Sequence, residues 1–223
     1  MENPEEAAPT PRAPMWKRLG FSRWGPRAVF ESMLIVLSVL LALWVNQWVE
    51  DRKTAERVAE ARSFFHEELK ANRAVVASER ILAHHLALRK GLSEALAQEP
   101  ASDEAVYEAI GRVFAGGIHP AGLRDAVWRS VSAGELMHAM EPREVFMLAD
   151  IYRLQANLDE INRSSYASFM NADTDTPAAR RKFARALALH LGDVVTTEQM
   201  LIGLYDDALV RLDSEPDGSA ARR

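Results

Sequence analysis

Cysteine is absent from this 223-residue sequence. Its absence excludes a disulfide framework, a thiolate zinc site, an iron–sulfur cluster and a cysteine nucleophile within these residues. An excess of basic residues is also lacking, because 27 Lys and Arg face 32 Asp and Glu, for a net charge of -5. Nucleic-acid binding depends on a concentrated basic face, so we expect no nucleic-acid partner.

Familiar catalytic and metal-binding motifs are missing as well. No HExxH, GxGxxG, GxxxxGK[ST], GxSxG or SxxK pattern occurs, and the six histidines show no compact metal-ligand spacing. The adjacent His84 and His85 point about 100° apart on a helix, which predicts one in solvent and the other at a helix contact. The His66-Glu67-Glu68 group is predicted to be solvated charge on an exposed helix side. We therefore expect no catalytic residue, no metal and no other cofactor.

The alternation of apolar and polar residues that marks a β-strand is also absent, so the predicted fold class is all-α. Glycine and proline do not occur between Pro26 and Gly91, which predicts a helix running unbroken out to about Gln98. One side of this helix is apolar, and Asn72 is expected at the edge of that stripe.

Charged residues are missing from Ser32 to Val49. As a helix this run is roughly 27 Å long, close to the roughly 30 Å thickness of the hydrocarbon core of a bilayer. At its ends we expect an acid near the headgroups and aromatic rings beside polar amides. The residues predicted to mark the membrane anchor are Glu31, Trp44, Asn46, Gln47 and Trp48.

Two other interpretations of the apolar run are less favoured. A buried core helix of this length usually has a polar face, and a cleaved signal peptide needs small residues just beyond the run. Here the run ends in Trp48-Val-Glu-Asp-Arg-Lys53. Residues 28–49 are therefore predicted to form an uncleaved transmembrane signal anchor.

The orientation of the anchor is predicted from the charged residues on either side of it. Four basic residues precede it and four follow at similar range, so the charge bias is nearly balanced. The shorter flank has fewer acids, which favours a cytoplasmic N-terminus. Residues 1–27 are then a disordered basic cytoplasmic tail, and residues 214–223 are a second disordered tail.

The region 50–213 is predicted to be one helical bundle domain. Helix starts are expected at Ser102 as an N-cap, at Pro142 in the first helical position, and at Thr176 before Pro177. Heptad-like spacing from Met147 to Ser165 indicates a seam for a partner helix. Short connections favour an antiparallel bundle of about three long and two or three short helices.

Candidate interaction residues lie on the apolar stripe, on the heptad seam and around a turn between two short helices. At that turn, Glu135 and His138 would line a pocket together with Trp128 and Gly134 if the short helices frame one. The complete set is Phe65, Leu69, Asn72, Trp128, Gly134 and Leu158.

Several segments resemble a family of uncharacterised bacterial single-pass membrane proteins. The resemblance lies in Glu31 to Trp48 with the charged Glu50-Asp-Arg-Lys53, in Phe65 to Arg73, and in Val127 to Leu136 with Leu148 to Tyr152. It implies an N-terminal anchor, a helical C-terminal region and a bacterial setting, and it carries no catalytic residues.

These observations together predict a non-enzymatic, membrane-anchored interaction or scaffold module. Its expected partners are the lipid bilayer and a second copy of the chain or an envelope protein that packs against its helices. The expected location is the bacterial inner membrane, with the C-terminal domain in the periplasm. The alternative is a ligand receptor or an enzyme with a pocket around Trp128, Gly134 and His138.

Overall fold

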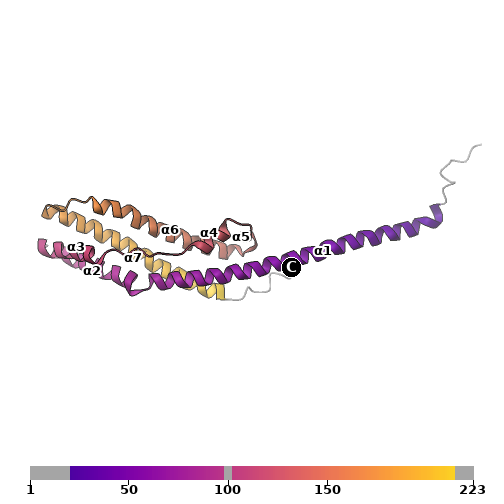
Figure 1. The fold of residues 1–223 in the computed structure, drawn as a ribbon, viewed down its shortest axis with the longest axis horizontal. Coiled ribbons are helices and arrows are strands. Elements are labelled where there is room, and N and C mark those ends of the chain that lie inside the picture. Colours follow the sequence, from indigo (N-terminus) through magenta and orange to yellow (C-terminus); the bar gives the residue numbers. More distant parts are fainter. Residues whose placement is uncertain (1–20, 98–101, 214–223) are drawn as a thin grey trace, which may run out of the picture. The chain divides into compact units, whose positions relative to one another are not determined.

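The computed structural model describes residues 21–97 and 102–213, and every regular element in these residues is a helix (Figure 1). The predicted all-α class is therefore confirmed. The helices are α1 (Phe21–Val76), the π-helix η2 (Glu79–Ala83), α2 (His84–Ala97), α3 (Asp103–Gly116), α4 (Ala126–Ser132), α5 (Leu136–Ala139), α6 (Pro142–Met170) and α7 (Pro177–Asp213).

The chain divides into two compact units, residues 1–53 and residues 54–223. The division falls within α1, between Lys53 and Thr54. The described part of the first unit is the beginning of α1, and the second unit contains all the other helices. We call the described part of the second unit, residues 54–97 and 102–213, the helical domain.

The predicted helix starts are confirmed, two of them by capping contacts. Ser102 Oγ accepts a hydrogen bond from the Ala105 amide at 3.3 Å, and Pro142 opens α6. Thr176 Oγ accepts from the Ala179 amide at 3.1 Å, immediately before α7 begins. These side chains satisfy amide groups that have no partner within the first turn of a helix.

The long run after the anchor is helical out to Ala97, but it is not unbroken. The α-helix ends at Val76, and Ser78 is extended, with φ -69° and ψ 155°. Both the amide and the hydroxyl of Ser78 donate to the Val75 carbonyl, at 3.2 and 2.7 Å. A serine that bonds to a nearby carbonyl offers the backbone an alternative to helix, and so the chain turns here without glycine or proline.

Two clusters of buried apolar side chains form the core of the helical domain. The first joins α1, α6 and α7 through side chains such as Phe65, Ile151 and Leu201. The second joins α2, α3 and α7 through side chains such as Leu92 and Leu187. Because α7 contributes to both clusters, it is the central helix of the domain.

The heptad seam of α6 faces this central helix. Figure 1 shows α6 and α7 side by side and antiparallel, joined by the short connection between them. Ile151 and Leu158 on the seam are fully buried, with Leu154 and Ile161 half-buried beside them. The partner helix predicted from the spacing therefore exists, and it belongs to the same chain.

Candidate functional site

The apolar segment of α1 has no covered side. Large apolar side chains from Val29 to Trp48 are exposed, including those of Leu37, Leu40 and Leu43. In the described residues, α1 supplies the one segment long and apolar enough to cross a membrane, by length and composition. A core helix of a soluble domain would bury much of this surface, so the segment is suited to an apolar surrounding.

Polar contacts begin at both ends of this segment. Arg27 lies 3.5 Å from the Glu31 carboxylate, before the apolar residues. Beyond them, Gln47 Nε2 donates to Asp51 Oδ1 at 2.7 Å, and the Arg52 guanidinium lies 5.9 Å from the centre of the Trp48 ring. Trp44 is exposed, and Asn46 borders a shallow hollow on the helix surface. An amphipathic ring beside charged groups is typical of the lipid headgroup region.

In the helical domain, the predicted interaction residues of the apolar stripe and the heptad seam are part of the core. Phe65 and Leu69 are 0% exposed, and Leu158 is 1% exposed. The Phe65 ring lies 6.2 Å from that of Tyr152 on α6, measured between ring centres. These side chains pack helices of one chain together and have no surface left for a partner.

Asn72 is also buried, so its predicted place at the edge of the stripe is wrong. Its Nδ2 donates to the Arg124 carbonyl at 2.7 Å, and its Oδ1 accepts from the Arg124 amide at 2.8 Å. One side chain thus satisfies both backbone groups of a loop residue that has no helical partner. Asn72 fixes the loop before α4 to the surface of α1.

Glu68 forms another polar link between α1 and the following helices. The prediction of a solvated His66-Glu67-Glu68 group is wrong for this residue, because Glu68 is buried. Its Oε1 accepts from the Tyr152 hydroxyl at 2.7 Å, and its Oε2 accepts from the Val127 amide at 3.2 Å. Burial, followed by the bond to Glu68, raises the pKa of Tyr152, so this phenol stays protonated as a donor.

Trp128 packs on the outer side of this network. Its ring stacks on Tyr152 with 5.1 Å between ring centres and 14° between planes. The residue is half-buried, whereas Gly134 and His138 are exposed. The tryptophan therefore supports the Glu68–Tyr152 contact, and it lines a pocket beside Tyr152 in whose wall Gly134 and His138 do not occur.

A buried histidine–glutamate pair joins α2 to α7. His85 and Glu198 are 0% and 1% exposed, with 2.9 Å between His85 Nδ1 and Glu198 Oε1. No hydrogen-bond partner for His85 Nε2 or Glu198 Oε2 is found in the described part of the chain. Of the two neighbouring histidines, His85 takes the predicted helix contact, while His84 is half-buried with its Nε2 2.8 Å from the Gly117 carbonyl oxygen.

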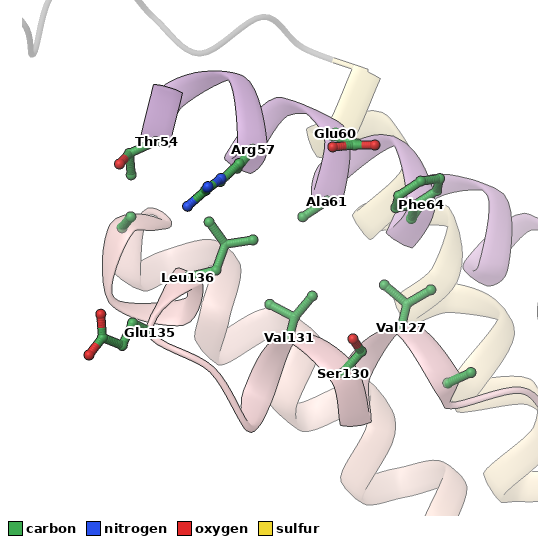
Figure 2. A pocket seen from close by; sticks show the side chains of 12 residues that line it. Thr54, Arg57, Glu60, Ala61, Phe64, Val127, Ser130, Val131, Glu135 and Leu136 are labelled. Carbon is green, nitrogen blue, oxygen red and sulfur yellow. The ribbon is translucent and has the colours of Figure 1, made fainter. Parts of the chain in front are cut away.

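A groove of about 830 Å³ runs between the start of α1 in the helical domain and the pair α4 and α5. Figure 2 shows Arg57 reaching from α1 into this space beside Leu136, while the Glu135 carboxylate points away from it. Its walls are mostly aliphatic or small. They are formed by Thr54, Arg57, Glu60, Ala61, Phe64, Ala126, Val127, Ser130, Val131, Glu135, Leu136 and Ala139.

The groove differs from the pocket expected from the sequence. It includes Glu135, but Trp128, Gly134 and His138 are not in its wall. In the sequence Arg57 is one of the four basic residues that follow the anchor, and spacing alone does not place it in a groove with Phe64. Their shared position in one groove depends on how α4 and α5 lie against α1, which helical periodicity does not encode.

Comparison with known proteins adds no relative: no family model, no curated protein and no solved structure matches this chain. What stands on the structure itself is an all-α protein whose α1 carries a segment apolar enough to span a membrane.

Proposed function

We propose that this protein is a membrane-anchored helical interaction module without enzymatic activity. The observation that carries the proposal is the ring of exposed apolar side chains around α1 between Val29 and Trp48. Burial of such a surface in hydrocarbon is strongly favourable, and the helical domain fills its own core without it. In this proposal residues 28–49 cross the bacterial inner membrane, the N-terminus is cytoplasmic and the helical domain is periplasmic.

The partner is an envelope protein or a second copy of the chain that packs against an exposed helix face. The interaction residues expected on the apolar stripe and the heptad seam are buried, so the contact surface must lie elsewhere on the domain. The side of α7 turned away from the core offers apolar side chains, with Leu189 72% exposed and Met200 54% exposed three turns further along. Exposed apolar side chains on one helix face support docking by another helix.

Photocrosslinking of the full-length protein in native membranes tests this proposal. A photoreactive residue at Leu189 or Met200 is expected to give one defined adduct, either a dimer of the chain or a single envelope protein. The control carries the photoreactive residue in place of Arg153, which is exposed on α6 and paired with Asp150. It is expected to give no adduct. Recovery of monomer alone from both α7 positions would contradict the proposal.

Topology is tested separately with reporter fusions at residue 10 and residue 215. A reporter that is active only in the cytoplasm is expected to work at residue 10 and to fail at residue 215. The opposite pattern would reverse the proposed orientation and place the partner in the cytoplasm.

Ligand reception is a second candidate function, and the groove beside α1 favours it. Its volume of about 830 Å³ lies within the range of roughly 300–1,000 Å³ that is usual for small-molecule sites.

A further inference from the structure

The groove between α1 and the α4–α5 pair has an apolar floor with one inward charge. Ala61, Val127, Val131 and Leu136 supply aliphatic surface along it, and the Phe64 ring at one end is 54% exposed. Because the walls are helices, the backbone groups of the lining residues are largely bonded within those helices. The groove therefore offers an occupant aliphatic contact and few backbone hydrogen bonds.

Arg57 is the charged group directed into the space (Figure 2). No ion pair or hydrogen bond of its guanidinium is found among the described residues, although Arg62 and Arg73, further along α1, each bind a carboxylate. Glu60 and Glu135 also line the groove, but Glu135 points outward. A guanidinium at the edge of apolar surface complements a carboxylate attached to an apolar body, because it binds both oxygens in parallel.

We propose that this groove binds a long-chain fatty acid, with the alkyl chain along Ala61, Val131 and Leu136 and the carboxylate on Arg57. The first groove residue, Thr54, follows Trp48 by only six positions in the sequence. A bilayer that holds the apolar segment of α1 also contains fatty acids. The groove thus begins only a few residues after the segment that would contact this source of ligand. This inference rests on ligand reception, the second candidate function, and names its ligand class; it is independent of the partner contact proposed on α7.

An extended peptide is less suited to the same surface. An extended peptide gains most of its affinity from backbone hydrogen bonds at a sheet edge, and the helical walls of this groove present no such edge. An alkyl chain carries no polar group along its length, so it leaves nothing unsatisfied when it lies on aliphatic helix walls.

The test is photolabelling of the full-length protein in phosphatidylcholine nanodiscs with a long-chain fatty acid that bears a diazirine within its alkyl chain. Mass spectrometry of the digested protein then locates the adducts. We expect adducts in two peptides of the helical domain, one covering 54–64 and one covering 126–139. A matched fatty alcohol with the same diazirine lacks the carboxylate and is expected to label only the apolar segment 28–49.

Variants separate the groove from general partition into lipid. Arg57→Gln is expected to lower fatty-acid labelling of the groove about tenfold, because the loss of a charge-assisted contact lowers the affinity by about that factor. Ser130→Trp, which fills the groove from α4, is expected to lower it as well. Arg129→Gln removes an exposed arginine that is paired with Asp125 outside the groove, and it is expected to leave the labelling unchanged.

Adducts confined to residues 28–49, or equal labelling of the groove by the acid and the alcohol, would overturn the proposal. Retained labelling in Arg57→Gln would do so as well, since this exposed side chain is not needed for folding. Circular dichroism of each variant confirms that the helical domain is intact. The α7 crosslinking result does not depend on any of these outcomes, so a failure here leaves the proposed partner contact standing.

Discussion

At the scale of single residues, the domain is organised by buried polar side chains that each satisfy groups on another segment. Glu68 accepts from both the Tyr152 hydroxyl and the Val127 amide. Replacing it by alanine leaves these two buried donors unpaired, at about 1–3 kcal/mol for each. We expect Glu68→Ala to lower the free energy of unfolding by about 2–6 kcal/mol, measured by urea unfolding in detergent micelles.

The neighbouring Glu67 provides a matched control for this prediction. Its side chain is 71% exposed and makes only a 3.5 Å contact with His66. Glu67→Ala removes the same functional group from the next position of the same helix, and we expect a change within about 0.5 kcal/mol. Equal losses for the two variants would mean that the buried contacts of Glu68 do not stabilise the domain.

His190 predicts a pH dependence of stability. Burial lowers its pKa from the ordinary 6.5, an effect that Asp193 opposes and His85 reinforces. The folded state therefore holds this imidazole neutral where the unfolded state already binds a proton. The stabilisation is complete above the unfolded pKa of 6.5, and it is lost as the pH falls from there through the lower folded pKa.

We expect the wild-type domain to lose stability as the pH falls below about 6.5, the unfolded pKa, with a slope of up to about 1.4 kcal/mol per pH unit from this group. His190→Gln does not titrate, so its unfolding free energy should fall less steeply over that range. Urea unfolding at a series of pH values measures the difference. Parallel curves for the two proteins would show that His190 titrates equally in both states.

At the scale of elements, one side chain attaches the loop before α4 to α1. Asn72 binds both the amide and the carbonyl of Arg124. We expect Asn72→Ala to free this loop, with the amide of Arg124 losing at least about tenfold in hydrogen-exchange protection. Amides in the middle of α7 should exchange at nearly unchanged rates. Unchanged protection at Arg124 would show that the loop is held by its apolar contacts alone.

The contact between α2 and α7 depends on the buried pair His85 and Glu198. Removing one partner leaves the other polar group buried and unpaired, so we expect His85→Leu and Glu198→Leu each to cost about 3–5 kcal/mol. The double variant replaces both groups with apolar ones, and its loss should be clearly smaller than the sum of the single losses. Additive losses in urea unfolding would mean that the pair is not coupled.

The elements themselves follow from local sequence to a large extent. Ser102, Pro142 and Thr176 mark helix starts through side-chain capping and the fixed backbone angle of proline, which act within a few residues. The heptad spacing on α6 correctly indicates a partner helix. The turn at Ser78 was missed because serine also occurs inside helices, and only its bond to the Val75 carbonyl shows that it interrupts one here.

The site residues were harder to predict, since each depends on two segments distant in the sequence. Phe65, Leu69 and Leu158 have the composition of an interaction surface, but they pack in a core cluster with other helices of the same chain. Asn72 and Glu68 looked like edge or solvent residues, because periodicity describes one helix and cannot reveal the backbone amides that they meet. Arg57 can be identified as a ligand-binding candidate only from the positions of α4 and α5, which form the other wall of its groove.

At the scale of the whole molecule, the apolar segment and the helical domain make independent predictions. The domain has its own core, so we expect its folding not to require residues 28–49, whereas the proposed location in the membrane requires them. We expect the full-length protein to stay in the membrane pellet after alkaline carbonate extraction, and a variant lacking residues 28–49 to be released. Hydrogen exchange of the released variant should retain the protection of α7. A full-length protein that washes off with carbonate would contradict the membrane anchor, while a released variant with an unprotected α7 would show that the domain depends on the anchored chain for its stability.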